Sequence, residues 1–297
     1  MSGSPDAISV TGRLLGTVSF TCRGRPLVVP PSSAVLLAFL LMRRGKPVER
    51  PKLVAVVEGG DVAEGPARRR VNTAVWRLRK LLEPAGAAHD SVLTTVGGGL
   101  ALSPACELRV DAVEFESACD TLARFDGRTE ADARRVADAG ALYGGDFLDG
   151  VYTEWALAER GRLADLHLAA LTRLAQWCRR RGEPERGLAH ARAAVAADPL
   201  REDLHRLVIQ LYADAGLPQL ATRQLEQCRA VLAEQLGIDP LPETVAVARV
   251  AARRDRPRAA DYDRAIRELE RSYDELRRLE ARLGRSIEAL RRSVTGW

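Results

Sequence analysis

The chain has 297 residues, of which 46% are hydrophobic and 29% are charged, and its formal net charge is +5 at pH 7. This composition excludes a disordered chain, and the length is sufficient for two or three domains with a sizeable core. No window reaches about 18 uninterrupted apolar residues, and the N-terminus lacks the basic region of a signal peptide, so we expect a cytoplasmic protein without a membrane-spanning helix.

The charged residues are unevenly distributed along the chain. Residues 1–110 carry 15 Lys and Arg against 8 Asp and Glu, a net charge of +7. Residues 111–255 carry 19 basic residues against 24 acidic ones, and residues 256–297 carry 11 basic residues against 8 acidic ones. A basic N-terminal third joined to an acidic body indicates that one domain contacts phosphate groups and that another does not.

Short β-strands are predicted at the start of the chain. Val, Thr and Phe are frequent there and glycines interrupt the runs, a pattern that favours strands over a helix. The predicted strands cover residues 8–10, 14–21 and 26–29. The segment Arg23-Gly24-Arg25 is the predicted turn between the last two strands.

Two short helices are predicted next, over residues 34–43 and 50–57. Ser32 or Ser33 can cap the first helix, and Gly45 ends it. Pro51 lies near the start of the second helix, where a proline is tolerated. The loop of residues 58–65 then leads into a third helix.

This third helix, predicted between Pro66 and Pro84, is strongly basic. At about 100° per residue, one of its faces is apolar and consists of Val71, Val75, Leu78 and Leu82. The opposite face carries Arg69, Thr73, Trp76, Arg77 and Lys80, with Arg70 and Asn72 at its margins. A cationic face without acidic residues, with Asn and Thr among the arginines, has the donors that the DNA major groove accepts. The alternative is a solubilising face on a helix that only packs.

A glycine-rich hairpin follows the basic helix. Residues 92–96 and 100–102 are β-rich and flank the three glycines of residues 97–99, which favours a tight turn. A phosphate-binding glycine loop is the alternative, but no helix that starts with Lys-Ser or Lys-Thr follows. Strands, three helices and a terminal hairpin, with the third helix basic, predict a winged helix-turn-helix whose third helix enters the major groove.

The chain after residue 110 is predicted to be almost entirely helical. Two similar junctions, Gly182–Pro184 and Gly216–Pro218, lie 34 residues apart, and each begins a helix. A helix–turn–helix period of this length is typical of tetratricopeptide repeats, which stack and leave a concave surface for protein partners. A generic helical bundle is the alternative.

The C-terminal residues 256–297 are predicted to contain one long helix with a heptad pattern, which Glu280 and Gly284 interrupt. The heptad residues are Ile266, Leu269, Tyr273, Leu276, Leu283, Ile287, Leu290 and Val294. The pattern leaves two alternatives, a coiled-coil dimer and a helix that folds back on the repeats.

We therefore predict a mainly α protein with a small β component, built from three parts. They are a winged helix-turn-helix DNA-binding domain (1–110), a tetratricopeptide-like domain (111–255) and a C-terminal heptad helix (256–297). Several motifs in these parts resemble the Streptomyces antibiotic regulatory protein (SARP) family, which joins an OmpR-like winged helix to a bacterial transcriptional activation domain. The matching motifs are residues 69–82, 110–116, 142–150 with Trp155, 198–203 and 234–240.

The resemblance implies a sequence-specific transcriptional activator, often of a secondary-metabolite (antibiotic) gene cluster. Such a protein binds direct repeats in double-stranded DNA near promoters, associates with itself there and recruits RNA polymerase holoenzyme. The residues expected to face bases are Arg69, Asn72, Thr73, Trp76 and Arg77. The residues expected to bind phosphates are Arg68, Arg70 and Lys80. The loop of residues 58–65 is the candidate polymerase contact, with a plain connector as the alternative.

Three segments depart from the family pattern. The basic stretch that often precedes the first helix is replaced by Pro30–Ser33, and the Leu-Trp common at the end of the second helix is replaced by Val57-Glu58. The wing reads Gly98-Gly-Leu-Ala101 where the family usually has Gly-Tyr-Arg-Leu, so it lacks the arginine that would enter the minor groove. The heptad tail is additional to the family.

No catalytic residue, metal site or cofactor is predicted. The four histidines lack the HExxH spacing, and there is no Gly-x-Ser-x-Gly, Walker lysine or GxGxxG motif. Asp146 and Asp149 place two carboxylates close together in the sequence, as an acid–base pair would require. A role in a loop or a helix cap explains them more simply. The five cysteines are scattered, and an odd count without a CxxC pair favours buried, reduced thiols. The alternative function is a tetratricopeptide-type scaffold for proteins with only nonspecific DNA binding.

Overall fold

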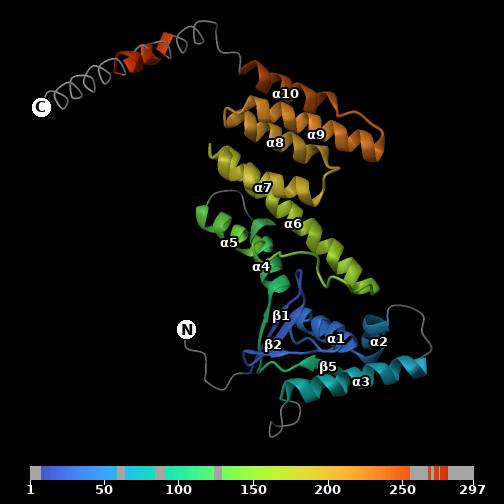
Figure 1. Cartoon of the computed structure of the whole chain (residues 1–297). Coiled ribbons are helices and arrows are strands. Elements are labelled where there is room, and N and C mark those ends of the chain that lie inside the picture. The colour runs from blue at the N-terminus through green and yellow to red at the C-terminus, as the bar shows by residue number, and fades with distance from the viewer. Residues whose placement is uncertain are drawn as a thin grey trace, which may run out of the picture. The chain divides into compact units, whose positions relative to one another are not determined.

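The computed structural model describes residues 8–58, 64–83, 91–123, 129–254, 267–268, 271–273 and 275–279. The chain divides into two compact units, Met1–Pro199 and Leu200–Trp297, whose elements are shown in Figure 1. The domain boundaries predicted at residues 110 and 255 stay predictions. Among the described residues, no helix combines the length and the apolar character needed to cross a membrane.

A four-stranded sheet opens the first unit, with the strand order β3-β2-β1-β6. Its strands are β1 (Ser9–Arg13), β2 (Ser19–Cys22), β3 (Arg25–Leu27) and β6 (Glu107–Val110). β1 pairs antiparallel with β2 and parallel with β6, a strand that the sequence pattern did not predict. The strand predicted over residues 14–21 is wrong in its first half, because β2 begins only at Ser19.

Three helices and a hairpin follow, as the winged helix-turn-helix prediction requires. They are α1 (Pro31–Met42), α2 (Arg50–Glu58), α3 (Glu64–Leu82), β4 (Leu93–Val96) and β5 (Gly99–Leu102). The prediction that Ser32 or Ser33 caps α1 is wrong: Pro30 occupies the cap position without a side-chain hydrogen bond. Because Pro31 lacks an N–H, the first turn has one donor fewer to satisfy. Ser33 is buried instead, with its hydroxyl 3.4 Å from the Ala74 carbonyl of α3.

The hairpin turn is narrower than the three glycines suggest. Gly97 and Gly98 have φ angles of +57° and +80°, which fit a two-residue turn, while Gly99 already belongs to β5. A Cβ atom on Gly99 would lie 3.2 Å from the backbone of Val48. Val48 and Leu100 exchange two backbone hydrogen bonds, so the wing is fixed to the segment between α1 and α2.

The remaining described helices are α4 (Asp111–Ala123), α5 (Glu130–Gly140), α6 (Glu154–Arg180) and α7 (Pro184–Ala197) in the first unit. The second unit contains α8 (Glu202–Asp214), α9 (Pro218–Leu236) and α10 (Pro242–Arg254). α6 packs with α7, and α8 packs with α9. Both pairs turn at a glycine in the left-handed region, Gly182 and Gly216, so the predicted repeat of helix pairs is confirmed.

In the first unit, the winged helix and the helices that follow share one core. Asp111, the first residue of α4, accepts hydrogen bonds from the backbone N–H groups of Leu14 at 2.8 Å and Leu15 at 3.1 Å. On the other side of the same loop, Gly16 N–H donates to the Asp146 carbonyl, and Leu148 N–H donates to the Leu14 carbonyl. These bonds use the backbone groups that a strand over residues 14–18 would need, which explains the late start of β2.

A second contact joins the N-terminal turn of α6 to the end of α2. The Trp155 Nε1–H group donates to the Val56 carbonyl at 3.1 Å, and the indole packs edge-on against Phe39 of α1 and Phe147. Arg160 donates to three backbone carbonyls of the preceding loop, at 2.6–3.0 Å. The motif of residues 142–150 with Trp155 therefore builds the junction between the two halves of the first unit.

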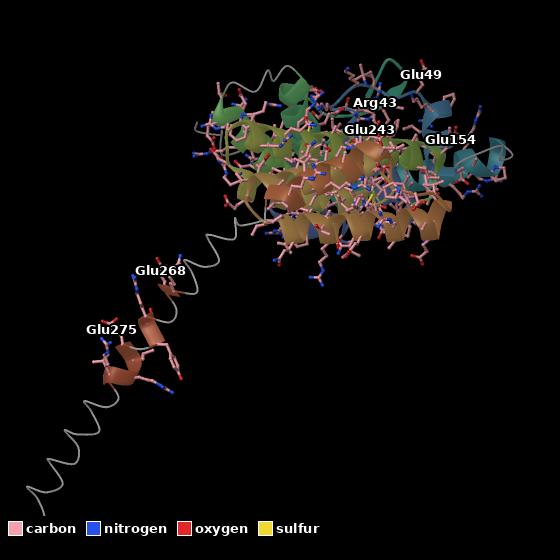
Figure 2. All side chains as sticks on the ribbon, turned by 90° about the horizontal axis from the view of Figure 1, so that it is seen from above. Arg43, Glu49, Glu154, Glu243, Glu268 and Glu275 are labelled. Atoms are coloured by element: carbon pink, nitrogen blue, oxygen red, sulfur yellow. The ribbon has the colours of Figure 1, made fainter. Side chains whose placement is uncertain are left out.

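The structure describes only part of the C-terminal heptad segment. Tyr273 and Leu276 are helical and 60% exposed, and Glu268 and Glu275 are labelled on this stretch in Figure 2. The other six heptad residues, together with Glu280 and Gly284, lie outside the described residues. The coiled-coil and folded-back alternatives both stay predictions. The five cysteines, in contrast, are all described, and all are buried as predicted.

We predict that Asp111→Ala lowers the free energy of unfolding by roughly 2–6 kcal/mol, because the buried N–H groups of Leu14 and Leu15 lose their acceptor. Urea denaturation followed by circular dichroism measures this loss. Asp120→Ala, which removes an exposed carboxylate from the same helix, is the matched control and should change stability little. Equal stability of the two variants would contradict a structural role for the Asp111 carboxylate.

Candidate DNA interface

Helix α3 has an apolar face and, opposite it, a cationic face. Val71, Leu78 and Leu82 are buried and Val75 is half-buried, so the predicted apolar face is confirmed. Ala67 and Ala74 are buried on the same side, where α3 packs against α1 and α2. Small residues at these two positions allow the helices to approach closely.

Every residue predicted to contact DNA is exposed on α3. These residues are Arg68, Arg69, Arg70, Asn72, Thr73, Trp76, Arg77 and Lys80. Their exposure follows from the helical period alone, because the buried residues of the same helix fix which side faces outward. The division of this set between bases and phosphates is not tested by exposure and remains part of the proposal below.

Trp76 lies on the surface, and its ring does not enter the core. The side chain is 56% exposed, and the Lys80 ammonium nitrogen lies 4.3 Å from the centroid of the indole. This geometry allows a cation–π attraction one helical turn along α3. Thr73 is also partly engaged: its hydroxyl donates to the Arg69 carbonyl at 2.9 Å, which leaves the methyl group and the oxygen lone pairs for a partner.

An ion pair joins the C-terminal end of α2 to α3. Arg70 Nε donates to Glu58 Oε1 at 2.6 Å, and Arg70 Nη2 donates to the other carboxylate oxygen. The hydrogen bonds to Glu58 raise the pKa of the Arg70 guanidinium, so its charge is retained. The Glu58 side chain is only 12% exposed, which means that the carboxylate is largely enclosed by this pairing. A phosphate would therefore have to compete with Glu58 for Arg70.

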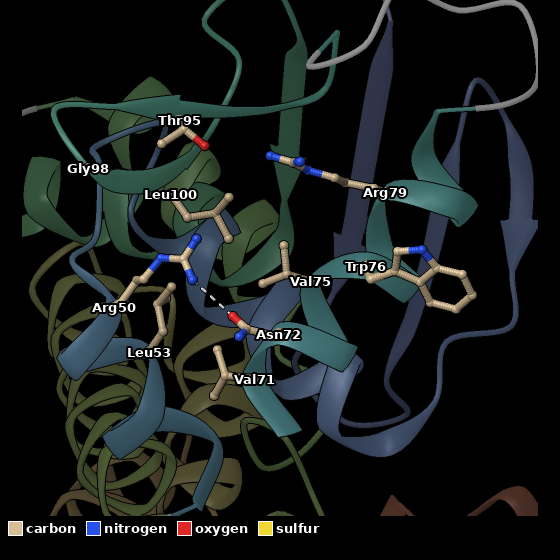
Figure 3. A pocket seen from close by; sticks show the side chains of 10 residues that line it. All are labelled: Arg50, Leu53, Val71, Asn72, Val75, Trp76, Arg79, Thr95, Gly98 and Leu100. Atoms are coloured by element: carbon tan, nitrogen blue, oxygen red, sulfur yellow. Dashed lines mark hydrogen bonds between the residues drawn. The ribbon is translucent and has the colours of Figure 1, made fainter. Parts of the chain in front are cut away.

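A hollow of about 210 Å³ lies between α2, α3 and the wing, as Figure 3 shows. Its apolar lining comes from Leu53, Val71, Val75 and Leu100. Its polar lining comes from Arg50, Asn72, Arg79 and Thr95, and Trp76 and Gly98 complete it. The Arg50 Nη1–H group donates to Asn72 Oδ1 at 2.9 Å across this hollow.

Sequence reasoning missed Arg50, Arg79 and Thr95 as residues of this surface. A helical wheel of α3 cannot identify Arg50 or Thr95, because they come from α2 and the wing. Arg79 lies beside the apolar stripe of α3 and is half-buried, so it falls between the two predicted faces. Most of the candidate polymerase loop, residues 59–63, lies outside the described residues.

Two family models match the chain. The model named "Transcriptional regulatory protein, C terminal" covers residues 24–102, which contain the helices and the wing described above. The "Bacterial transcriptional activator domain" model covers residues 110–252. This order of domains is the one that the resemblance implied. The chain belongs to the SARP family.

Curated relatives of this SARP chain include regulators from Streptomyces and Mycobacterium. It is 28% identical over 216 residues to the regulatory protein AfsR of Streptomyces coelicolor, covering 71% of this chain and 21% of AfsR. It is 27% identical over 250 residues to the transcriptional regulatory protein MoaR1 of Mycobacterium tuberculosis, covering 79% of this chain and 76% of MoaR1. The chain thus spans about a fifth of the length of AfsR but most of MoaR1.

A solved structure shares the SARP fold. Mycobacterium tuberculosis EmbR, in complex with a low affinity phosphopeptide, superposes with a TM-score of 0.64. The match covers 86% of this chain and 67% of the EmbR chain at 24% sequence identity. At this identity the likeness shows the common fold.

The wing of this SARP chain offers few side chains to a partner. All four residues of β5 are buried, and the exposed tip consists of Thr95, Val96, Gly97 and Gly98. No side chain of this tip is charged. The tip therefore presents one hydroxyl, one apolar side chain and backbone amides, and the cationic surface is concentrated on α3.

We predict that Glu58→Gln raises affinity for duplex DNA and steepens the slope of log affinity against log salt concentration by up to about 0.9, since Glu58 no longer competes with a phosphate for Arg70. Fluorescence anisotropy over a salt series measures both effects. Glu107→Gln is the matched control, because it changes the charge equally and breaks the Glu107–Arg109 pair of β6. Identical salt slopes for the two variants would show that Arg70 does not gain a phosphate.

Proposed function

We propose that the chain is a sequence-specific, DNA-binding transcriptional activator. The observation that carries this proposal is the exposed cationic face of α3, presented by a winged helix-turn-helix scaffold whose third helix is the one that enters the major groove. Arginine, asparagine and threonine on this face supply the donors and the methyl group that distinguish base edges. Membership of the SARP family supports a role in transcription.

The finer features of the proposal follow from the family resemblance. We propose that two copies bind direct repeats near a promoter, recruit RNA polymerase holoenzyme and activate a secondary-metabolite gene cluster. On the DNA, Arg69, Asn72, Thr73, Trp76 and Arg77 face the bases. Phosphates are held by Arg68, Arg70 and Lys80. The exposure of all eight side chains supports their contact with DNA, and their division between bases and phosphates follows from their places around α3.

Selection of binding sites from random duplexes tests the proposed function. The full chain is used at physiological salt with excess competitor DNA, because nonspecific phosphate contacts alone give salt-dependent binding without sequence choice. We expect a short motif that is repeated at a spacing of about one helical turn. Recovery of no motif would overturn the proposal and favour the protein-interaction scaffold, with α3 as a nonspecific cationic face.

We predict that Arg69→Ala and Lys80→Ala weaken binding in different ways. Loss of a base-reading arginine should relax sequence choice at one position and cost about 1–3 kcal/mol on the selected site, while loss of a phosphate contact should weaken all DNA evenly. Affinities of each variant for the selected site and for a scrambled duplex separate the two effects. If both variants lose the same affinity on both duplexes, the division into base-facing and phosphate-binding residues is wrong.

A further inference from the structure

Helix α10 exposes hydrophobic side chains beside the face with which it packs. Thr244, Ala248 and Ala251 are buried, and α10 contacts α8 and α9, as Figure 1 shows. Val250 is 55% exposed, however, and Val247 is only half-buried. Units of a helical repeat need a neighbour on each side to bury their hydrophobic surface. The exposed strip of α10 is therefore a surface on which a further helix can pack.

Helices α8 and α10 occupy equivalent places in successive repeats. The segments Asp198–Leu200 and Asp239–Leu241 both read Asp-Pro-Leu, lie 41 residues apart, and precede α8 and α10. Under this shift of 41 residues, Val250 corresponds to Ile209, which is 0% exposed. The difference in exposure indicates that α8 has neighbours that α10 lacks among the described residues.

Helix α9 is the helix that follows α8 and covers it. Gln224 of α9 is hydrogen-bonded to the buried His205 of α8, with 2.8 Å between Nε2 and Nδ1. The buried residues of α9 are Ala221, Gln224, Leu225, Cys228 and Leu232. A helix after α10 with hydrophobic residues at this same spacing would complete a third helix pair.

The C-terminal segment has this spacing at the same shift of 41 residues. The residues that correspond to the five buried positions of α9 are Tyr262, Ala265, Ile266, Leu269 and Tyr273. All five are hydrophobic, whereas every residue between them is charged, apart from Ser272. The end of α9 at Leu236 corresponds to Arg277, and the heptad pattern is interrupted soon afterwards, at Glu280.

The described parts of this segment fit a helix with one hydrophobic side. Residues 267–268, 271–273 and 275–279 are helical, and Tyr273 is 60% exposed. The other four hydrophobic residues of the match lie outside the described residues. The charged residues of the segment would form the opposite side of the helix. A polar outer side is what the last helix of a repeat array needs to remain soluble.

We propose that residues 261–277 form the second helix of a third pair and pack antiparallel against α10 of the same chain. The register follows from the preceding pair, in which His205 and Gln224 correspond to Ala246 and Ala265. Two alanines at this contact allow the helices to approach closely. The third pair goes beyond the proposed function and does not depend on DNA binding by α3.

A coiled coil with a second copy of the chain is the competing arrangement, because a heptad pattern also suits it. Two observations favour packing within one chain. The hydrophobic spacing of the tail reproduces that of α9 at the shift that the Asp-Pro-Leu segments set independently. The exposed Val250 of α10 also requires a partner that a coiled coil of two tails would not supply.

The test is crosslinking of the full chain with a short bismaleimide after paired cysteine substitutions. Ala246→Cys with Ala265→Cys is the pair in register. Ala246→Cys with Arg267→Cys is the matched control, since Arg267 lies only two residues further on but roughly 200° around the helix. All five native cysteines are buried, and burial raises the pKa of each thiol, which slows its reaction with maleimide. The unsubstituted chain measures what remains of that reaction.

We expect the pair in register to crosslink within one chain at least about tenfold faster than the control pair, because packing raises the effective concentration of one thiol at the other. Peptide mass spectrometry identifies the linked residues, and a denaturing gel separates links within a chain from links between chains. Equal rates for the two pairs, no reaction of either pair, or links between chains would overturn the proposal. Crosslinked dimers of a chain with Ile266→Cys alone would identify the coiled coil instead.

Hydrogen exchange provides a second measurement that needs no cysteine. In the unsubstituted chain, the amides of residues 261–277 should exchange at least about tenfold more slowly than those of residues 285–297. Ile266→Asp, which places a charge on the hydrophobic side, should abolish this protection. Arg267→Asp, on the charged side, should retain it. Equal exchange in the two segments, or the same loss in both variants, would overturn the proposal.

Discussion

The carboxylate of Asp111 is the interaction on which the architecture of the first unit depends. It accepts from the N–H groups of Leu14 and Leu15, which have no strand partner, and it lies at the first residue of α4, where a negative charge is favourable. Removal of this acceptor would leave two buried donors unsatisfied, each of which costs about 1–3 kcal/mol. The winged helix and the following helices share one core, and a residue of the segment matched by the activation-domain model holds the loop that follows β1.

The same junction reaches the cationic side of the winged helix. Trp155 of α6 donates to the Val56 carbonyl of α2, and two residues later Glu58 holds Arg70 of α3. Two hydrogen-bonded contacts at the end of α2 thus link the helical half of the first unit to the cationic face. A neutral hydrogen bond such as that of Trp155 contributes about 0.5–1.5 kcal/mol to stability.

The polar side chains on the cationic face of α3 differ in the contacts that they make. Of the polar residues on α3, Arg70 is paired with Glu58, Asn72 accepts from Arg50, and Lys80 lies over Trp76. Each contact removes part of a side chain's hydrogen-bonding capacity or fixes its direction. The wing tip adds no charge, so the charged side chains around the hollow come from α2 and α3.

The sequence by itself determined the elements that follow a local period: the two faces of α3, the glycine hairpin, and the helix pairs that turn at Gly182 and Gly216. These features depend on residues a few positions apart, which a pattern records directly. Only the tertiary structure decided that residues 14–18 form a loop, that Ser33 is buried, and that Arg50 pairs with Asn72. In each of these cases the partner is 22 to 134 residues away in the chain, such as Leu148 for Leu14. For the loop and for Ser33, the hydrogen bonding of buried groups outweighs local propensity.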